Sequence, residues 1–263
     1  MSRLKELFKK KTNRILNVYC TAGYPHLNST IGVIKALQEN GVDMIELGIP
    51  YSDPLADGPI IQASNTKAIA NGMTIEKLCE QLKNFRNSPG EGKVGEILPV
   101  ILMGNMNPVL QYGFEKFCAD AAAIGTDGLI LPDLPEYEFE TEYGAIIKKY
   151  RLDFIFLVTP ETSERRVKKL DQLSSGFLYA VSSSSTTGKD KDMSHIKTYL
   201  QRLKSYNLRN PILAGFGIKD KQSFDTVCEN ANGAIIGSAF IKSLKNSGDI
   251  FKTTKQFLKS ILE

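Results

Sequence analysis

Short, continuously apolar runs alternate along the chain with longer segments in which apolar positions recur at the spacing of a helix. A continuous apolar run of about four to eight residues is typical of a parallel strand that is buried on both faces. The sequence therefore predicts eight strands, at Ile15–Thr21, Met44–Gly48, Leu98–Met103, Gly128–Leu131, Phe154–Val158, Gly176–Val181, Pro211–Ala214 and Gly233–Gly237.

Helical periodicity occupies the spaces between these runs. It is clearest at Ser29–Glu39, Phe114–Ile124, Tyr137–Tyr150, Glu164–Leu173, Ile196–Tyr206 and Ser223–Glu229. Eight strands with interleaved helices indicate an α/β protein with a (β/α)8 TIM barrel rather than an open sheet. No Ser-, Pro- or Gly-rich linker divides the 263 residues, so one barrel domain over residues 1–263 is expected.

The segment that precedes the first strand predicts an extra helix. Leu4, Leu7 and Phe8 fall on one face of it, and the lysines around them form a solvated face. The segment lacks the apolar core of a signal peptide, so a cytoplasmic protein is expected, or one of the plastid stroma if a plastid genome encodes the chain.

Composition excludes several classes of function. The formal net charge of +4, from 33 basic and 29 acidic residues, is too weak to predict nucleic-acid binding. No apolar run approaches the 18 residues or so of a membrane-spanning helix. The four cysteines are far apart and only two histidines are present, so neither a disulfide framework nor a metal site is expected.

Candidate chemistry should lie at the carboxyl ends of the strands, where barrel active sites occur. Glu46 interrupts the second apolar run near its end, on the same face as Met44 and Gly48. If that face points inward, burial would suit Glu46 to acid–base catalysis, although pairing with a buried cation is an equal alternative. The following loop contains Asp53 and Asp57, which could be catalytic or could cap the turns of a proline-rich loop.

Two glycine turns indicate a phosphate site. Gly215-Phe216-Gly217 and Gly237-Ser238 follow the seventh and eighth predicted strands, the usual place for phosphate in such barrels. Tyr179 is either an inward hydroxyl or a core aromatic, and Ser182–Asp190 is either a mobile lid or a plain surface loop. The glycine-rich motif Gly90–Gly95 follows a helix and precedes a strand, so it is not a dinucleotide-binding fingerprint. No predicted strand contains a lysine, which argues against Schiff-base catalysis.

Several of these motifs together resemble the tryptophan synthase alpha chain family. The most specific is the run Glu46–Pro59, which reads ELGIPYSDPLADGP. The others, in matching order, are Thr21–Pro25, Asn107–Val109, Leu131–Pro135, Gly215–Ile218 and Gly237–Ala239.

The resemblance implies cleavage of indole-3-glycerol phosphate to indole and glyceraldehyde 3-phosphate, as a step of tryptophan biosynthesis. It implies no cofactor in this chain. It also implies that a beta chain receives the indole, in an alpha2-beta2 heterotetramer. A free-standing lyase and a catalytically silent barrel that activates a beta chain are the alternatives, and the presence of Glu46 and Asp57 argues against the silent barrel.

By motif position, Glu46 would be the general acid and base, and Asp57 would hold the indole N–H. Substrate would be bound by Tyr179, by the phosphate-side residues Phe216, Gly217, Gly237, Ser238, Thr187 and Gly188, and by the indole-pocket residues Tyr19, Leu102, Ile130 and Leu157. The partner-facing positions would be Pro50, Asp53 and Pro135. The chain departs from the family pattern in the lid and at Asn105 and Met106, where aromatic residues are usual.

Overall fold

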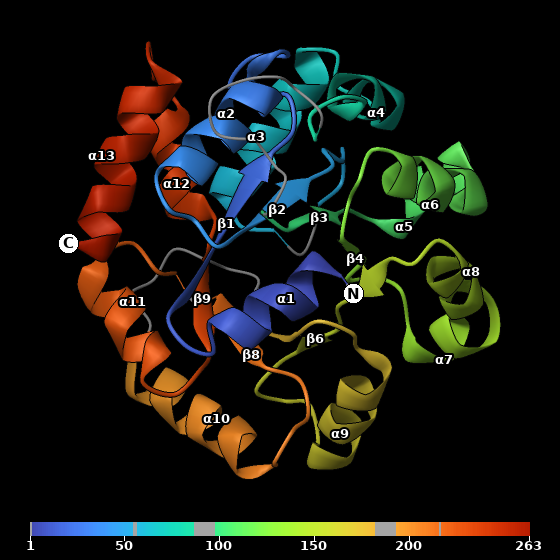
Figure 1. The fold of residues 1–263 in the computed structure, drawn as a ribbon, viewed down its shortest axis with the longest axis vertical. Coiled ribbons are helices and arrows are strands. Elements are labelled where there is room, and N and C mark those ends of the chain that lie inside the picture. Colours follow the sequence, from blue (N-terminus) through green and yellow to red (C-terminus); the bar gives the residue numbers. More distant parts are fainter. Residues whose placement is uncertain (1, 55–56, 87–97, 182–192, 216) are drawn as a thin grey trace.

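Parallel strands form the centre of the molecule (Figure 1). The computed structural model describes residues 2–54, 57–86, 98–181, 193–215 and 217–263. In these ranges nine strands pair in the order β5-β4-β3-β2-β1-β9-β8-β7-β6. They are β1 Ile15–Thr21, β2 Met44–Gly48, β3 Val100–Met103, β4 Gly128–Ile130, β5 Asp153–Phe154, β6 Leu157–Val158, β7 Leu178–Val181, β8 Ile212–Gly215 and β9 Gly233–Ile236.

The two ends of this order meet in one segment of chain, because β5 and β6 are separated by only two residues. Ile155 donates its N–H to Leu129 O at 3.1 Å, and Phe156 O accepts from Tyr179 N at 3.0 Å. The segment is therefore bonded to β4 on one side and to β7 on the other, which closes the barrel. The sequence predicted one strand here, and the structure divides it in two because the segment pairs first with one neighbour and then with the other.

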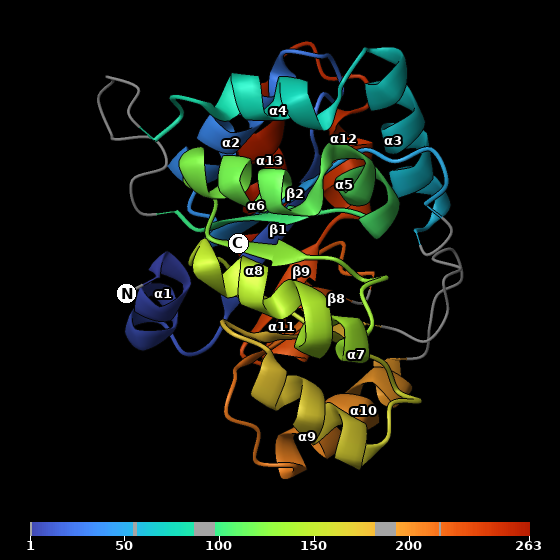
Figure 2. The ribbon, with the colours of Figure 1, turned by 90° about the vertical axis from the view of Figure 1, so that its right-hand side faces the viewer.

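Helices surround the barrel (Figures 1 and 2). Their bounds are α1 Arg3–Lys10, α2 Ser29–Glu39, α3 Pro59–Ala70, α4 Ile75–Leu82, α5 Met106–Tyr112, α6 Phe114–Ala123, α7 Glu136–Glu138, the π-helix η1 Phe139–Tyr143, α8 Gly144–Lys149, α9 Glu164–Leu173, α10 Met193–Ser205, α11 Lys221–Cys228, α12 Ser238–Leu244 and α13 Ile250–Leu262. The predicted helices at α2 and α9 have these same bounds. Within the described ranges, no helix has the length and apolarity needed to cross a bilayer.

The helix predicted at Tyr137–Tyr150 is instead three segments, α7, η1 and α8. The Gly144 N–H bonds to Phe139 O, five residues earlier, which is the spacing of a π-helix. A Cβ at Gly144 would lie 2.6 Å from that same oxygen, so glycine permits the wide turn. The periodicity of the apolar residues in the sequence does not predict this π-helix.

Strand alternation divides the core into an inner and an outer layer. The inner layer takes one residue from each strand position around the barrel, and Leu4 from α1 joins it. Its members are Leu4, Ile15, Met44, Ile101, Ile130, Ile155, Phe177, Leu213 and Ile235. The outer layer packs between the sheet and the helices.

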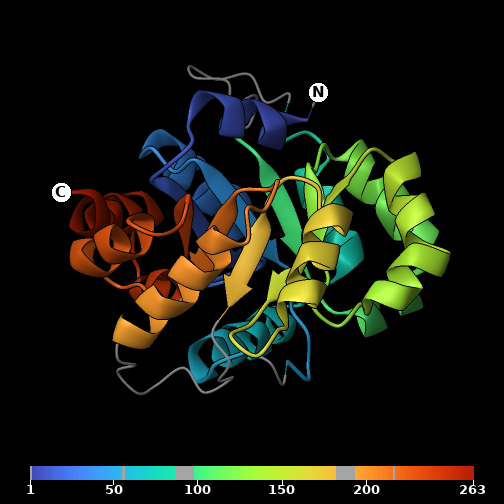
Figure 3. The ribbon, with the colours of Figure 1, turned by 90° about the horizontal axis from the view of Figure 1, so that it is seen from below.

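Helix α1 covers the end of the barrel from which the strands start, and the strand arrows point away from it (Figures 2 and 3). Ser2 caps the helix by accepting from Lys5 N, and Leu4 is fully buried against the inner layer. Arg3 pairs with the buried Asp127 at 2.8 Å. The extra N-terminal helix predicted from the sequence is therefore a plug for this end, which leaves the carboxyl ends of the strands for a site.

Candidate active site

Glu46 points into the barrel near the carboxyl end of β2. Because Met44 belongs to the inner layer, alternation places Glu46 and Gly48 on the same inner face. The carboxyl is fully buried, and Asn17 of β1 donates from Nδ2 to its Oε1 at 2.6 Å. Among the described residues, no cationic side chain pairs with Glu46 and its Oε2 has no hydrogen-bond partner. In this part of the chain, the alternative of a buried ion pair is thus not observed.

Burial controls the protonation of Glu46. Desolvation raises its pKa from 4.5 to about 8, and the hydrogen bond from Asn17 offsets part of that rise. The side chain therefore carries a proton at neutral pH, yet it gives the proton up at little cost. That property suits a group which both donates and accepts protons.

Asp57 lies in the loop between β2 and α3. Asn65 of α3 donates to its Oδ2 at 3.4 Å, and Gln62 Nε2 donates to its backbone oxygen at 2.8 Å. Desolvation raises the pKa of Asp57 to about 6, and the bond from Asn65 acts in the opposite direction. Asp57 is therefore mostly charged at neutral pH, while Glu46 is mostly neutral.

Two tyrosines share this end of the barrel with the carboxyls. The hydroxyl of Tyr19 lies over Gly48, where a Cβ would approach it to 2.1 Å, and that of Tyr179 lies over Gly215, where a Cβ would be 2.8 Å away. Burial raises the pKa of each phenol, and the charges of Glu46 and Asp57 raise both further. Both carboxyls are thus within electrostatic reach of both phenols.

The combination favours acid–base chemistry on a neutral or cation-forming substrate. One carboxyl can donate a proton, a second supplies a negative charge, and the phenols stay protonated as donors. In the described ranges, no cluster of three or more His, Cys, Asp or Glu side chains is arranged to hold a metal ion.

The residues expected on the phosphate side are only partly described. Gly217 has a φ of +61°, which glycine adopts without strain, and Gly237 precedes the first residue of α12, Ser238. Three expected features lie outside the described residues. They are Phe216, the lid Ser182–Gly188 with its phosphate-side residues Thr187 and Gly188, and the motif Gly90–Gly95.

One expected pocket residue lies on the wrong face of its strand. Leu102 belongs to the outer layer, because Ile101 beside it points inward, whereas Met103 packs against the inner layer. The structure therefore contradicts the expectation that Leu102 points into the barrel, and Met103 is the neighbouring residue of β3 that does. Ile130 belongs to the inner layer and Leu157 packs against it, so both are placed where a lining role requires.

The three residues expected to face a partner differ in their exposure to solvent. Asp53 and Pro135 are exposed near the carboxyl ends of the strands, but Pro50 is buried within the chain. Because Pro50 is buried, it offers little surface for a partner to contact. Met106, at a position where the family has an aromatic, is the first residue of α5 and is buried.

Two polar residues of the site were not among the sequence predictions. Asn17 contacts Glu46, and Asn65 contacts Asp57. Asn17 carries a signal of the kind that identified Glu46, because it is a polar residue inside an apolar strand and shares the face of Tyr19. Asn65 lies in an ordinary helical pattern and carries no such signal.

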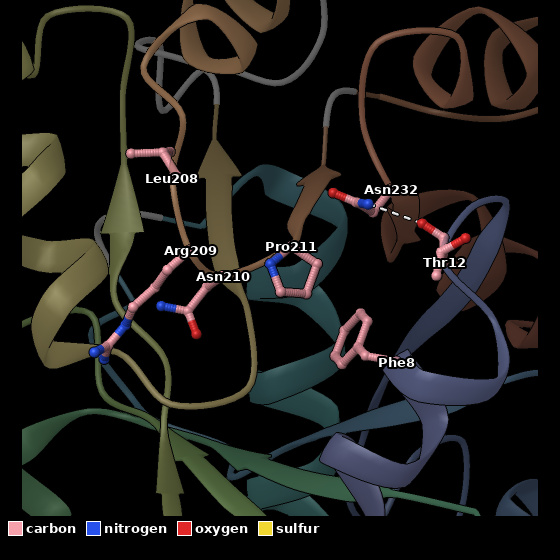
Figure 4. Close-up of a pocket in the computed structure, with 7 residues that line it drawn as sticks. All are labelled: Phe8, Thr12, Leu208, Arg209, Asn210, Pro211 and Asn232. Atoms are coloured by element: carbon pink, nitrogen blue, oxygen red, sulfur yellow. Dashed lines mark hydrogen bonds between the residues drawn. The ribbon is translucent and has the colours of Figure 1, made fainter.

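A pocket of about 290 Å³ occupies the opposite end of the barrel (Figure 4). Phe8 of α1, Thr12, the segment Leu208–Pro211 and Asn232 line it. Its polar groups are bonded within the chain, since Asn232 donates to Thr12 O at 2.8 Å and Arg209 donates to Gln172 O at 2.6 Å. It gathers no acid–base pair and lies away from Glu46, so it is not the candidate active site.

Known proteins with similar sequences belong to one family. A family model described as the tryptophan synthase alpha chain matches residues 4–261. The tryptophan synthase alpha chain of Flavobacterium johnsoniae is 49% identical over 249 residues, which cover 94% of this chain and 95% of that protein. The alpha chain of Parabacteroides distasonis is 44% identical over 262 residues, which cover 99% of each.

Solved structures give the same result. Tryptophan synthase subunit alpha from Legionella pneumophila superposes with a TM-score of 0.87 at 32% identity, covering 99% of this chain and 97% of that one. A chain of tryptophan synthase from M. tuberculosis superposes with a TM-score of 0.83 at 29% identity, covering 99% and 100%. These likenesses support the barrel that the alternation of strands and helices predicts.

Proposed function

This chain belongs to the tryptophan synthase alpha chain family, a family of lyase-type enzymes of tryptophan biosynthesis, and we propose that it cleaves indole-3-glycerol phosphate to indole and glyceraldehyde 3-phosphate. The observation that carries the proposal is Glu46, a buried acid that points into the barrel at the strand ends. With a pKa of about 8, it holds the proton that this cleavage needs at neutral pH.

The reaction begins with transfer of the Glu46 proton to C3 of the indole ring. This step turns the ring into an indoleninium cation, which can accept the electrons of the bond to the side chain. The Glu46 carboxylate then removes the proton from the hydroxyl on the adjoining carbon. That carbon becomes the aldehyde, the carbon–carbon bond breaks, and its electrons restore neutral indole with Glu46 protonated again.

Asp57 supports the cationic intermediate. Its pKa of about 6 leaves it charged at neutral pH, so it can accept a hydrogen bond from the indole N–H and stabilise the positive ring. Asn65 orients this carboxylate from α3. Tyr19 and Tyr179 enclose the ring, and Ile130, Met103 and Leu157 supply apolar walls.

The phosphate of the substrate is assigned to the glycine turns after β8 and β9. Gly217 and Gly237 let backbone N–H groups approach the phosphate oxygens, and the hydroxyl of Ser238 adds a donor. A phosphate held there leaves the glycerol chain to extend toward Glu46, since both turns lie at the same end of the barrel as the end of β2.

The direct test is release of indole from indole-3-glycerol phosphate by the purified chain, compared with Glu46→Gln. The amide keeps the shape of the side chain but cannot exchange the proton, so we expect turnover to fall by about 10²–10⁴-fold or more. The matched control is Glu6→Gln, an exposed residue of α1, which should keep full turnover. A folded Glu46→Gln protein with near-normal turnover would contradict the assignment, and wild type inactive with and without a beta chain would favour a silent barrel.

We also propose that the product indole passes to a beta chain in an alpha2-beta2 heterotetramer. The exposed Asp53 and Pro135 support this, because they lie on loops at the same end as the active site. A free-standing lyase is the alternative outcome, and it would show full activity that a cognate beta chain does not change.

A further inference from the structure

Inside the barrel, a neutral amide makes the contact with the proposed catalytic acid. Asn17 is fully buried on β1, and its Nδ2 lies 2.6 Å from Oε1 of Glu46 on β2. In the register of β1 on β2, Asn17 lies opposite Met44. Its side chain therefore extends along the strand direction to reach Glu46. Within the described ranges this is the only hydrogen bond to that carboxyl.

Each partner in this contact keeps one free atom. Asn17 Oδ1 and Glu46 Oε2 are both buried, and neither has a hydrogen-bond partner in the part of the chain that the structure describes. A buried polar atom left unpaired is costly. One such atom on each partner of a single hydrogen bond indicates a pair that serves more than one state.

The other groups that interact with Glu46 are acids. Tyr19 of β1 and Tyr179 of β7 interact with it electrostatically inside the barrel, and Cys20 does so from the outer layer. Asp57 interacts with both tyrosines, and none of these groups brings a positive charge. Asn17 is therefore the group that can stabilise the carboxylate without an ion pair to fix it in that state.

We propose that Asn17 is a positioning residue that holds Glu46 in both of its protonation states. Toward the carboxylate, Nδ2 donates to Oε1 as observed. When Glu46 carries its proton, a half-turn of the amide presents Oδ1 as the acceptor, because the terminal torsion of asparagine has two nearly equivalent settings. The proposal rests on the proposed function, in which Glu46 alternates between acid and base.

Removing the amide should change the acidity of Glu46. In Asn17→Leu the carboxylate loses its donor while burial stays, so we expect the pKa of Glu46 to rise by at least about one unit. In Asn17→Asp the shape is kept but a second carboxyl adjoins the first, so the pKa of the pair should rise further. The second variant also covers the case in which leucine prevents folding.

The decisive measurement is the titration of the Glu46 carboxyl by carbon-13 NMR, assigned by its absence in Glu46→Gln. It needs no substrate, so its result is independent of whether the chain cleaves indole-3-glycerol phosphate. The activity measurement is the pH profile of kcat/KM, whose alkaline fall should move to higher pH with the carboxyl, while KM changes little. The matched control is Asn232→Leu, which removes a similar amide at the opposite end of the barrel.

A merely structural Asn17 would behave as the control does, with a lower melting temperature and an unshifted Glu46 titration. That result in a folded Asn17→Leu or Asn17→Asp protein would overturn the proposal. A shifted titration in a protein without cleavage activity would instead leave Asn17 assigned and remove the proposed function.

Discussion

At the scale of single residues, Glu46 connects activity with stability. A carboxyl enclosed by the barrel cannot be solvated by water, so its ionised form is disfavoured in the folded chain but not in the unfolded one. The group that the reaction needs is thus also a source of instability once it ionises.

This connection predicts the pH dependence of folding. The folded pKa of about 8 lies above the ordinary 4.5, so between these values the folded state binds a proton that the unfolded state lacks. The free energy of unfolding should therefore fall as the pH rises through this window. Glu46→Gln lacks the transition, so relative to wild type it should gain at least about 1 kcal/mol between pH 5 and pH 9.

Urea unfolding of both proteins at pH 5 and pH 9 measures the difference. Glu6→Gln is the matched control, because Glu6 is exposed and should show no such gain. An equal difference between wild type and Glu46→Gln at both pH values would mean that the carboxyl is solvated in the folded chain.

Asp57 should act on the transition state rather than on binding. Its charge matters most once the indole ring is cationic, so Asp57→Asn should lower kcat strongly and leave KM nearly unchanged. The raised pKa adds a further expectation, because kcat/KM of wild type should fall as the pH drops below about 6 and Asp57 takes up a proton. Steady-state kinetics across pH test both, with the exposed Asp53→Asn in the same loop as control. A raised KM with unchanged kcat would restrict Asp57 to ground-state binding.

The alternation of side chains between the two faces of a strand explains which site residues the sequence could predict. Glu46 stands out because a charged residue interrupts an apolar strand, and the structure puts it on the inner face. Leu102 and Met103 are both apolar, so the pattern alone could not say which points inward. Asn17 was recognisable by the rule that identified Glu46, whereas its contact with that carboxyl needed the register of β1 on β2.

At the scale of elements, the alternation of apolar runs and helical segments was sufficient to predict the barrel. The bounds of β1, β2, α2 and α9 were also predictable, because turn residues mark their ends. The division between β5 and β6 was not, since it depends on a change of hydrogen-bonding partner within one apolar run. The π-helix at Phe139–Tyr143 depends on one close approach at Gly144, which periodicity does not record.

Helix α1 should stabilise the barrel without affecting catalysis. Leu4 is fully buried in the inner layer, so Leu4→Ala leaves a cavity at the end where the strands start. We expect a loss of about 2–5 kcal/mol in the free energy of unfolding. Turnover of the folded fraction should stay normal, because the carboxyls lie at the other end. Denaturation and kinetics of Leu4→Ala are compared with Lys5→Ala, whose side chain is exposed on the same helix; equal stabilities would exclude the plug.

At the scale of the whole molecule, hydrogen bonds join two loops and the first turn of α5 at the carboxyl ends of the strands. Tyr51, in the loop that carries Asp53 and Asp57, accepts from Asn107 of α5 at 3.3 Å. The first residue of α5, Met106, donates its N–H to both carboxyl oxygens of Asp133 at 3.0 Å, in the loop after β4. A partner that contacts any of these three segments therefore acts on the loop that positions Asp57.

This linkage predicts that a beta chain activates the proposed reaction. A misplacement of about 1 Å can cost a catalytic group about 10²-fold in rate, so a partner that orders the Asp57 loop should raise turnover by at least about tenfold, or about 1.4 kcal/mol of barrier. Indole release is measured while a cognate beta chain is titrated into the purified chain. Asp53→Lys should weaken the activation. Glu229→Lys should not, because Glu229 is exposed near the opposite end of the barrel.

A substrate analogue should in turn tighten the binding of the beta chain, because the coupling between two sites is reciprocal. Full activity of the isolated chain, unchanged by the beta chain, would contradict the coupling and favour a free-standing lyase.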